Sequence, residues 1–257
     1  MSKNLFDIVI LVGPNDNEIV EHMLPYAKKN VLDHRKIYLI CADPTINIEG
    51  AITIDERIFP FSIDDISNQF GARWRNGWYL QQLLKMYAGN VISDLLNRYL
   101  VIDCDTHFLR PTRFITEDGK TIHTTGTENN SVYFEHMNRL DKTLFKIHPL
   151  SGIAHHTMFN TEILNEMFKR IENNFNNEKP FWKLYLDAID VKQFMYSGAA
   201  ENELYFTYLY VYHKDTMETR TLKWHNTGTF NPAYAQQFDF VSVHWYMRPG
   251  KTVPPYE

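Results

Sequence analysis

Two aspartates, Asp103 and Asp105, directly follow the apolar run at residues 99–102. If a strand continues through Asp105, both carboxylates point to the same side and Cys104 points the other way. Paired carboxylates repel each other unless a cation lies between them, and a hard divalent ion is the natural occupant. Two solvated aspartates in a surface turn are the alternative. Because ligands bind at strand ends in open α/β sheets, we expect a metal site here.

The residues before this pair predict the sheet that positions it. A short β-branched run at residues 5–12 predicts a buried strand, and a second apolar run at 36–41 predicts another. Asp16 or Asn15 could cap the helix between them, in which Pro25 marks a kink or a split. Strand, helix and strand in this order indicate a parallel sheet with crossover helices.

The other elements follow from periodicity and turn residues. Apolar residues at helical spacing predict a helix at residues 77–88, and the clearest amphipathic pattern lies at 161–173. We further expect helices at 135–147, 181–189 and 199–212, a hairpin at 114–125, and strands at 52–54, 151–159, 219–224 and 239–246.

Composition limits the kind of protein. The 257 residues fit one α/β domain, and 44% hydrophobic residues are ample for its core. A net charge of -5 argues against a nucleic-acid partner. No run approaches the length of a membrane span. Cys41 and Cys104 lie in or beside strand-like runs, which suits free thiols in a reducing compartment. We therefore expect a soluble, cytoplasmic protein.

The order of these segments resembles the nucleotide-sugar-dependent glycosyltransferases of the A-type fold. The metal motif of that family is similar to YLVIDCDTHFLRP at residues 99–111, and its upstream helix is similar to GWYLQQLLK at 77–85. In that family a histidine near the C-terminus often completes the metal site, and VHW at residues 243–245 is similar to the segment that contains it. The chain resembles uncharacterised bacterial glycosyltransferase-like proteins and capsid-glycosylating enzymes of large algal viruses. The resemblance covers about residues 5–246.

The resemblance implies a fold and an activity. We expect a single A-type α/β domain with a mixed, mainly parallel central sheet flanked by helices. About residues 1–110 would bind the nucleotide donor, 111–248 the sugar and the acceptor, and 249–257 would form an irregular tail. The enzyme would move a sugar from a UDP- or GDP-sugar to a hydroxyl group of a glycan or other glycoconjugate.

A metal held by Asp103 and Asp105 would neutralise the charge that develops on the leaving diphosphate, which gives Asp105 a part in catalysis. His244, at the end of a late strand, is our choice for a third ligand, and an ordinary buried histidine is the alternative. Magnesium prefers oxygen ligands, whereas imidazole suits manganese, so His244 favours Mn²⁺ over Mg²⁺.

The loop after the first strand is the candidate nucleoside site. It contains Val12, Gly13 and Asp16, and its glycine permits close backbone approach, although a turn without a ligand is the alternative. Lys85 could pair with the aspartates or reach a phosphate. Arg73 is a further candidate cation, but it could equally form a surface ion pair of little value.

The second half should supply the remaining groups. His155 and His156 face opposite ways in a strand, so at most one lines the site. In the similar enzymes an acidic residue at the start of a late helix often lies close to the reacting carbon, and Glu201 and Glu203 match that pattern. On a helix these two lie about 200° apart, so they cannot both point inward. We favour Glu201 as general base because tyrosines share its face. A charged first helical turn is the alternative.

Two other functions remain open at this point. Phosphatases of the haloacid dehalogenase type also end a strand in Asp-x-Asp, although their motif normally lies near the N-terminus. Thr106 follows the second aspartate immediately, and His107 takes the position where that family has threonine or valine. The other alternative is a carbohydrate- or nucleotide-binding module with a vestigial site.

Overall fold

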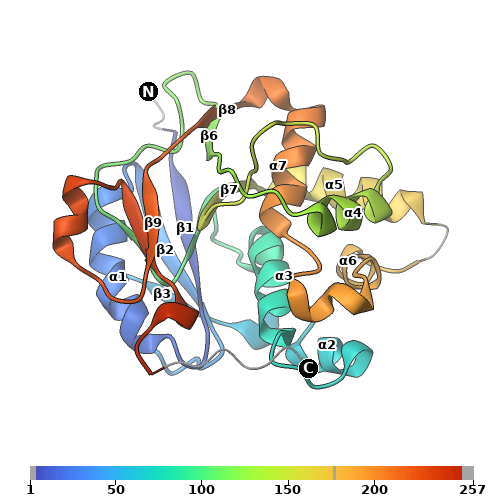
Figure 1. The fold of residues 1–257 in the computed structure, drawn as a ribbon, viewed down its shortest axis with the longest axis horizontal. Helices are drawn as coiled ribbons and strands as arrows, with labels where there is room; N and C mark the ends of the chain where they lie inside the picture. Colours follow the sequence, from blue (N-terminus) through green and yellow to red (C-terminus); the bar gives the residue numbers. More distant parts are fainter. Residues whose placement is uncertain (1–3, 176–177, 251–257) are drawn as a thin grey trace.

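A five-stranded sheet in the order β3-β2-β1-β4-β7 lies at the centre of the fold (Figure 1). The first four strands run parallel and β7 runs antiparallel to β4, so the sheet is mixed, as predicted. The computed structural model describes residues 4–175 and 178–250. The strands are β1 (Phe6–Val12), β2 (His34–Cys41), β3 (Ile52–Asp55), β4 (Arg98–Asp103) and β7 (His156–Asn160).

The strand β1 shows why this sheet forms. All seven of its residues are buried, because helices or a second sheet cover both faces. Its side chains alternate between two hydrophobic clusters: Ile8 and Ile10 belong to one, and Val9 and Leu11 to the other. The continuous apolar run in the sequence follows from this burial on both sides.

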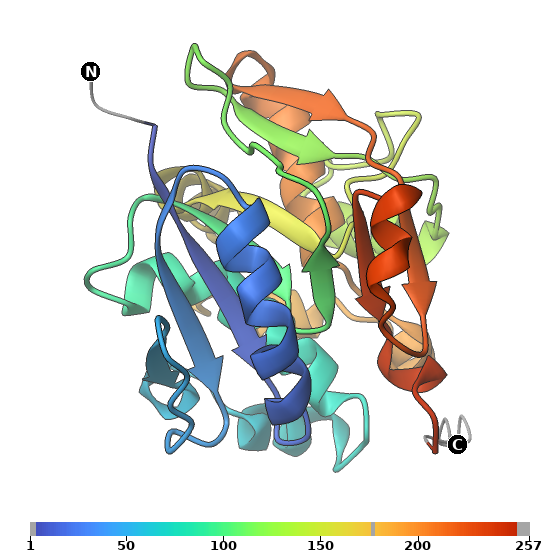
Figure 2. The same ribbon diagram turned by 90° about the vertical axis from the view of Figure 1, so that its left-hand side faces the viewer.

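One face of the sheet is covered by α1 (Asn17–Asn30) and by a second, three-stranded sheet in the order β5-β10-β9 (Figure 2). The rings of Phe108 and Phe240 are 5.5 Å apart and join this sheet to the cluster beneath α1. Pro25 lies within α1 and does not split it. The strands are β5 (Thr106–Phe108), β9 (Trp224–Thr227) and β10 (Phe240–Val243).

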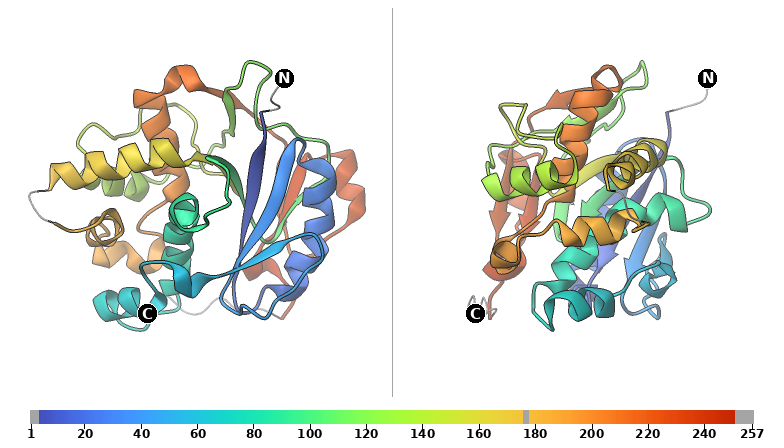
Figure 3. Two further views of the ribbon diagram at one scale, coloured as in Figure 1. Left: turned by 180° about the vertical axis from the view of Figure 1, so that it is seen from behind. Right: turned by 90° about the vertical axis from the view of Figure 1, so that its right-hand side faces the viewer.

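The other helices contribute to the larger cluster on the opposite face. Figure 3 shows α3, α5 and α7 together on the side away from α1. This cluster includes residues from both expected halves, such as Tyr38 and Tyr205, so the chain forms one α/β domain. The helices are α2 (Ile63–Phe70), α3 (Asn76–Val91), α4 (Ser131–Leu140), α5 (Thr161–Asn174), α6 (Phe181–Asp187) and α7 (Glu201–Tyr212).

Several predicted elements differ from those observed. The predicted helix at 135–147 is α4, which begins earlier and ends before Asp141, where the backbone becomes extended. The hairpin at 114–125 is present, with Gly119 at φ 93° in its turn and an antiparallel bridge between Ile115 and Thr121. Its second arm, β6 (Thr121–Thr124), also pairs in parallel with β8 (Met217–Arg220), which was not predicted. The predicted strand at 219–224 is therefore wrong: β8 and β9 belong to different sheets.

The strand that carries the aspartates also ends earlier than predicted. β4 stops at Asp103, residues 104 and 105 form a turn, and β5 begins at Thr106. The alternation expected for a continuous strand therefore does not apply to Asp105. Among the described residues, none of the helices is long and apolar enough to cross a membrane.

Candidate functional site

The parallel strands bring two chain segments together at the carboxyl edge of the sheet. β1 and β4 are neighbours, and Leu11 lies opposite Asp103 in their register. The loop that follows β1 therefore lies beside the aspartates that follow β4. In this loop the N–H of Asp16 donates to the carbonyl of Gly13 at 3.1 Å, and Gly13 lies so close that a Cβ there would be 2.9 Å from Asp16 Oδ2.

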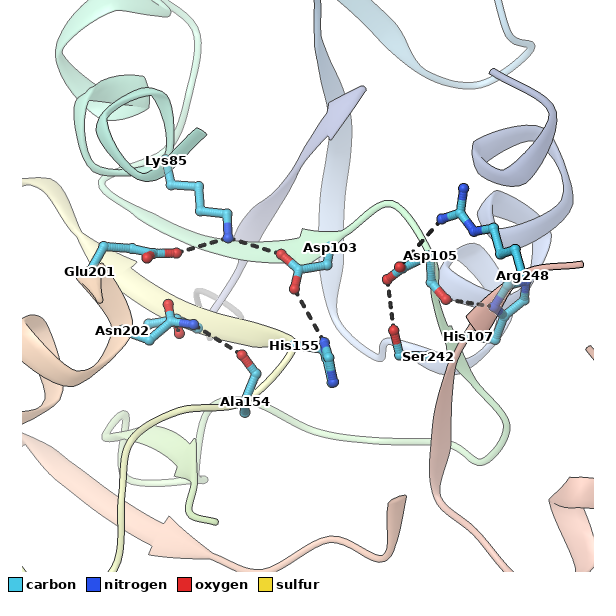
Figure 4. A network of polar contacts seen from close by, with 11 residues as sticks. Lys85, Asp103, Asp105, His107, Ala154, His155, Glu201, Asn202, Ser242 and Arg248 are labelled. Atoms are coloured by element: carbon cyan, nitrogen blue, oxygen red, sulfur yellow. Dashed lines mark hydrogen bonds and ion pairs between the residues drawn. The ribbon is translucent and has the colours of Figure 1, made fainter. Parts of the chain in front are cut away.

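Asp103 lies between two nitrogen groups (Figure 4). Lys85 Nζ donates to Oδ1 at 2.9 Å, and His155 Nδ1 lies 3.3 Å from Oδ2. Burial alone would raise the pKa of the Asp103 carboxyl, but the Lys85 charge and the His155 contact hold it well below its usual range. Burial likewise opposes protonation of His155, yet the neighbouring carboxylates raise its pKa. Asp103 is thus a firmly ionised carboxylate.

Lys85 links Asp103 to a second carboxylate. It extends from α3, and its Nζ also donates to Glu201 Oε1 at 2.8 Å at the start of α7. Burial favours the neutral amine, but the two carboxylates outweigh this and raise the lysine pKa. Glu201 is only 5% exposed and holds Lys85 in place. A general-base role for Glu201 would require this ion pair to loosen.

Asp105 has a different environment, in the turn between β4 and β5. Ser242 Oγ donates to Oδ1 at 2.8 Å, and Arg248 Nη2 is 3.4 Å from Oδ2. Burial and the charge of Asp103 raise the pKa of the Asp105 carboxyl. Figure 4 shows the two aspartates engaged with different partners, with Lys85 on one side of the cluster and Arg248 on the other.

Arg248 joins this cluster to the loop after β1. Its Nη1 donates to Asp16 Oδ1 at 3.0 Å, and its Nε donates to the carbonyl of Val243 at 2.9 Å. Asp16 occupies the N-cap position of α1 as expected, but its side chain makes no capping hydrogen bond. Its carboxylate binds Arg248.

His244 follows β10 and is the third expected metal ligand. Its backbone N–H donates to the carbonyl of Thr227 at 2.9 Å, and its ring is 5.8 Å from that of His155, measured between centroids. Burial, with the charge of His155, lowers the pKa of His244 to about 4. Its buried Nδ1 has no hydrogen-bond partner in the described part of the chain. A neutral imidazole with an unused ring nitrogen is the form that binds metals.

The donor types therefore fit a divalent ion: two carboxylates and one neutral imidazole. The present arrangement does not gather them, since residues 4–175 and 178–250 contain no group of three His, Cys, Asp or Glu side chains placed to hold a metal. Lys85 and His155 occupy the oxygens of Asp103, and Ser242 and Arg248 occupy those of Asp105. An ion would have to replace some of these contacts.

Other candidate residues lie outside the cluster. Arg73 donates to the carbonyl of Phe70 at 2.8 Å. Within the described part of the chain, no ion pair joins it to the carboxylates of the cluster, which are Asp16, Asp103, Asp105 and Glu201. His156 faces away from His155, as alternation predicts, and its Nε2 is 2.8 Å from Thr124 Oγ1. Val12 is buried, so that only its backbone could approach a nucleoside.

The two glutamates of α7 are both buried, contrary to the prediction that only one points inward. They reach different partners. Glu203 Oε2 accepts hydrogen bonds from Ser151 Oγ at 2.7 Å and from the N–H of Gly152 at 2.8 Å. Because the loop before β7 wraps around this side of α7, Glu203 fixes that loop, whereas Glu201 faces Lys85.

Comparison with known protein families matches residues 3–241 to a family of unknown function, DUF6492. The chain belongs to this family. No curated protein was found to match it. The matched segment includes Lys85, both aspartates and Glu201, and it ends just before Ser242.

Sequence reasoning missed Ser242 and Arg248. Ser242 lies between two valines in the fully buried strand β10, and a polar residue within such an apolar run is a detectable signal. Arg248 follows a short 3₁₀ turn, Trp245–Met247, and nothing in the local sequence indicates a partner 232 residues away.

Proposed function

We propose that this protein is a metal-dependent glycosyltransferase with an A-type fold, which transfers a sugar from a nucleoside diphosphate sugar to a hydroxyl acceptor. One observation carries the proposal: Asp103 ends β4 and Asp105 lies in the turn after it, beside the loop after β1, at the carboxyl edge of a mostly parallel sheet. This edge is where open α/β sheets bind their ligands.

The arrangement supports a division of roles within the cluster. The loop with Gly13 and Asp16 would receive the nucleoside, because the glycine permits close backbone approach. Asp103, Asp105 and His244 would hold a Mn²⁺ or Mg²⁺ ion. When bound, such an ion neutralises charge on the leaving diphosphate.

Lys85 and Glu201, which are paired with each other, would both act at the reacting centre. Lys85 keeps Asp103 ionised and orients it through the 2.9 Å contact. Glu201 is the candidate base for the proton of the acceptor hydroxyl group, because its carboxylate is held at the same cluster by the start of α7.

Release of nucleoside diphosphate tests this function directly. The protein is incubated with UDP- or GDP-sugars and Mn²⁺, and free UDP or GDP is measured with and without glycan acceptors. We expect release from one donor class and a loss of about 100-fold or more in Asp105→Asn, because the ion loses a charged ligand. Asp94→Asn is the matched control, since Asp94 is 58% exposed and pairs with Lys36 on the surface. Equal release by Asp105→Asn and wild type would refute the metal role.

The pairing within the cluster favours a second candidate, a binding module without turnover. Lys85 pairs with Asp103 and Glu201, and Arg248 pairs with Asp16 and Asp105, so each of the four carboxylates has a cationic partner without a metal ion. Such a module would bind a nucleotide or a sugar in calorimetric titrations but would release no diphosphate from any donor.

A further inference from the structure

Arg248 bridges two carboxylates that are far apart in the sequence, Asp16 in the loop after β1 and Asp105 in the turn after β4. The Asp16 contact is 3.0 Å and the Asp105 contact is 3.4 Å, and all three side chains are at most 21% exposed. Ion pairs shielded in this way are screened less by solvent than pairs on an open surface. The guanidinium is therefore an integral part of the cluster.

The position of this guanidinium conflicts with an ion at Asp105. Arginine remains protonated at all relevant pH values, so it cannot adapt by losing its charge. Two positive groups a few ångströms apart repel each other strongly where water is scarce. An ion that takes the oxygens of Asp105 must therefore expel Arg248, or Arg248 must exclude the ion.

His244 and Arg248 lie on one short segment, residues 244–248, which follows β10. His244 carries the unused ring nitrogen, and Arg248 carries the competing charge. Between them, Trp245 packs against Trp74 with ring centroids 5.9 Å apart. The backbone of Met247 lies so close to Gly228 that a Cβ at Gly228 would collide with it. These contacts and the Arg248 ion pairs hold the segment over the site together, so that release of Arg248 from Asp16 and Asp105 would remove one of its anchors.

We propose that Arg248 is a built-in counter-cation that competes with a divalent ion for Asp105, so that segment 244–248 closes the site without the ion and is released when the ion binds. This inference rests on the metal part of the proposed function. It adds a form of regulation: in the free protein Arg248 offsets part of the negative charge of the site and segment 244–248 covers it, and ion binding uncovers it.

Manganese binding provides the first test. Mn²⁺ is titrated into wild type and Arg248→Gln, and free Mn²⁺ is measured by electron paramagnetic resonance. We expect Arg248→Gln to bind roughly tenfold more tightly or better, because the competing charge is gone. Arg113→Gln is the matched control: Arg113 pairs with Asp33, beyond the far end of α1 from Asp16, and it loses the same charge. It should bind like wild type.

Amide hydrogen exchange provides the second test. Saturating Mn²⁺ should accelerate exchange in residues 244–250 of wild type, and Arg248→Gln should show fast exchange there without the ion. Equal or weaker Mn²⁺ binding by Arg248→Gln overturns the proposal. So does unchanged exchange in wild type at saturation.

The outcomes separate this inference from the proposed function. Tighter binding by Arg248→Gln with no turnover of any sugar nucleotide supports the counter-cation and rejects the glycosyltransferase. Turnover with equal Mn²⁺ affinity in both proteins rejects the counter-cation alone. If no variant binds Mn²⁺, both the counter-cation and the metal-dependent chemistry are rejected.

Discussion

Lys85 is a buried lysine that forms ion pairs with two carboxylates at once. It is 9% exposed and lies within 2.9 Å of two carboxylate oxygens, one from Asp103 and one from Glu201. Desolvating three charges is costly, and the attraction among them repays this cost only while all partners are present. The cluster is therefore more sensitive to the loss of the cation than a surface ion pair would be.

Replacement of Lys85 by methionine should destabilise the protein. Lys85→Met leaves Glu201 buried without a counter-charge, and we expect the free energy of unfolding to fall by about 3 kcal/mol. Chemical denaturation monitored by tryptophan fluorescence measures this change. The double variant Lys85→Met/Glu201→Gln should recover part of the loss, because the unpaired carboxylate is then neutral. A double variant no more stable than Lys85→Met would contradict this explanation.

The individual residues show what the sequence could reveal. Asp103 was predictable because an apolar strand ends at it, and Lys85 was predictable because it lies within a clear helical pattern. The different partners of His155 and His156 agree with the expected opposite orientations, although His155 lies just before β7 and not within it. Arg248 was not predictable, since its partners depend on how chain segments far apart in sequence meet in space.

The helices α3 and α5 approach each other closely at Gly89. A Cβ at Gly89 would collide with the side chain of Thr161, the first residue of α5. The glycine therefore permits contact between the two helices at a cost in helix propensity.

Replacement of Gly89 by alanine tests this contact. Helix propensity alone would stabilise Gly89→Ala by about 1 kcal/mol, but overpacking costs typically about 1–3 kcal/mol. We expect a net loss of stability, measured as a lower melting temperature. Adding Thr161→Ala should restore part of it by removing the colliding atoms. If Gly89→Ala alone is more stable than wild type, the helices have room that the structure does not indicate.

At the scale of elements, prediction succeeded where one local pattern dominated. The helix at 161–173 matches α5 within one residue, and the strand at 36–41 lies within β2, because both have a clear hydrophobic period. Prediction failed where pairing decided the structure. Residues 121–124 join β8, nearly a hundred residues later, and a local turn signal cannot reveal such a partner.

The molecule as a whole should lose stability in mild acid. Burial lowers the pKa of His123 to about 3 and of His136 to about 4, whereas the ordinary value is 6.5. Between these values the unfolded chain binds more protons than the folded one, so stability falls as the pH falls below 6.5. We expect a loss on the order of 2 kcal/mol per histidine from pH 7 to pH 5.

Urea unfolding at the two pH values measures this loss. His136→Gln should show a smaller difference between them, because one of the two protonation sites is removed. Its Nε2 contact with the carbonyl of Tyr185, 2.9 Å long, can be replaced by the glutamine amide. Identical unfolding free energies at pH 7 and pH 5 in wild type would show that these histidines do not titrate on unfolding.

The second sheet has a consequence for the order in which the protein can fold during synthesis. β5 is synthesised well before its partner β10, which begins only at Phe240. Until then, Phe108 and the cluster beneath α1 lack the ring of Phe240, and Asp105 lacks Ser242. Apolar surface at Phe108 therefore stays uncovered until Phe240 has been synthesised, and we expect chains truncated before residue 240 to depend on chaperones and to be degraded.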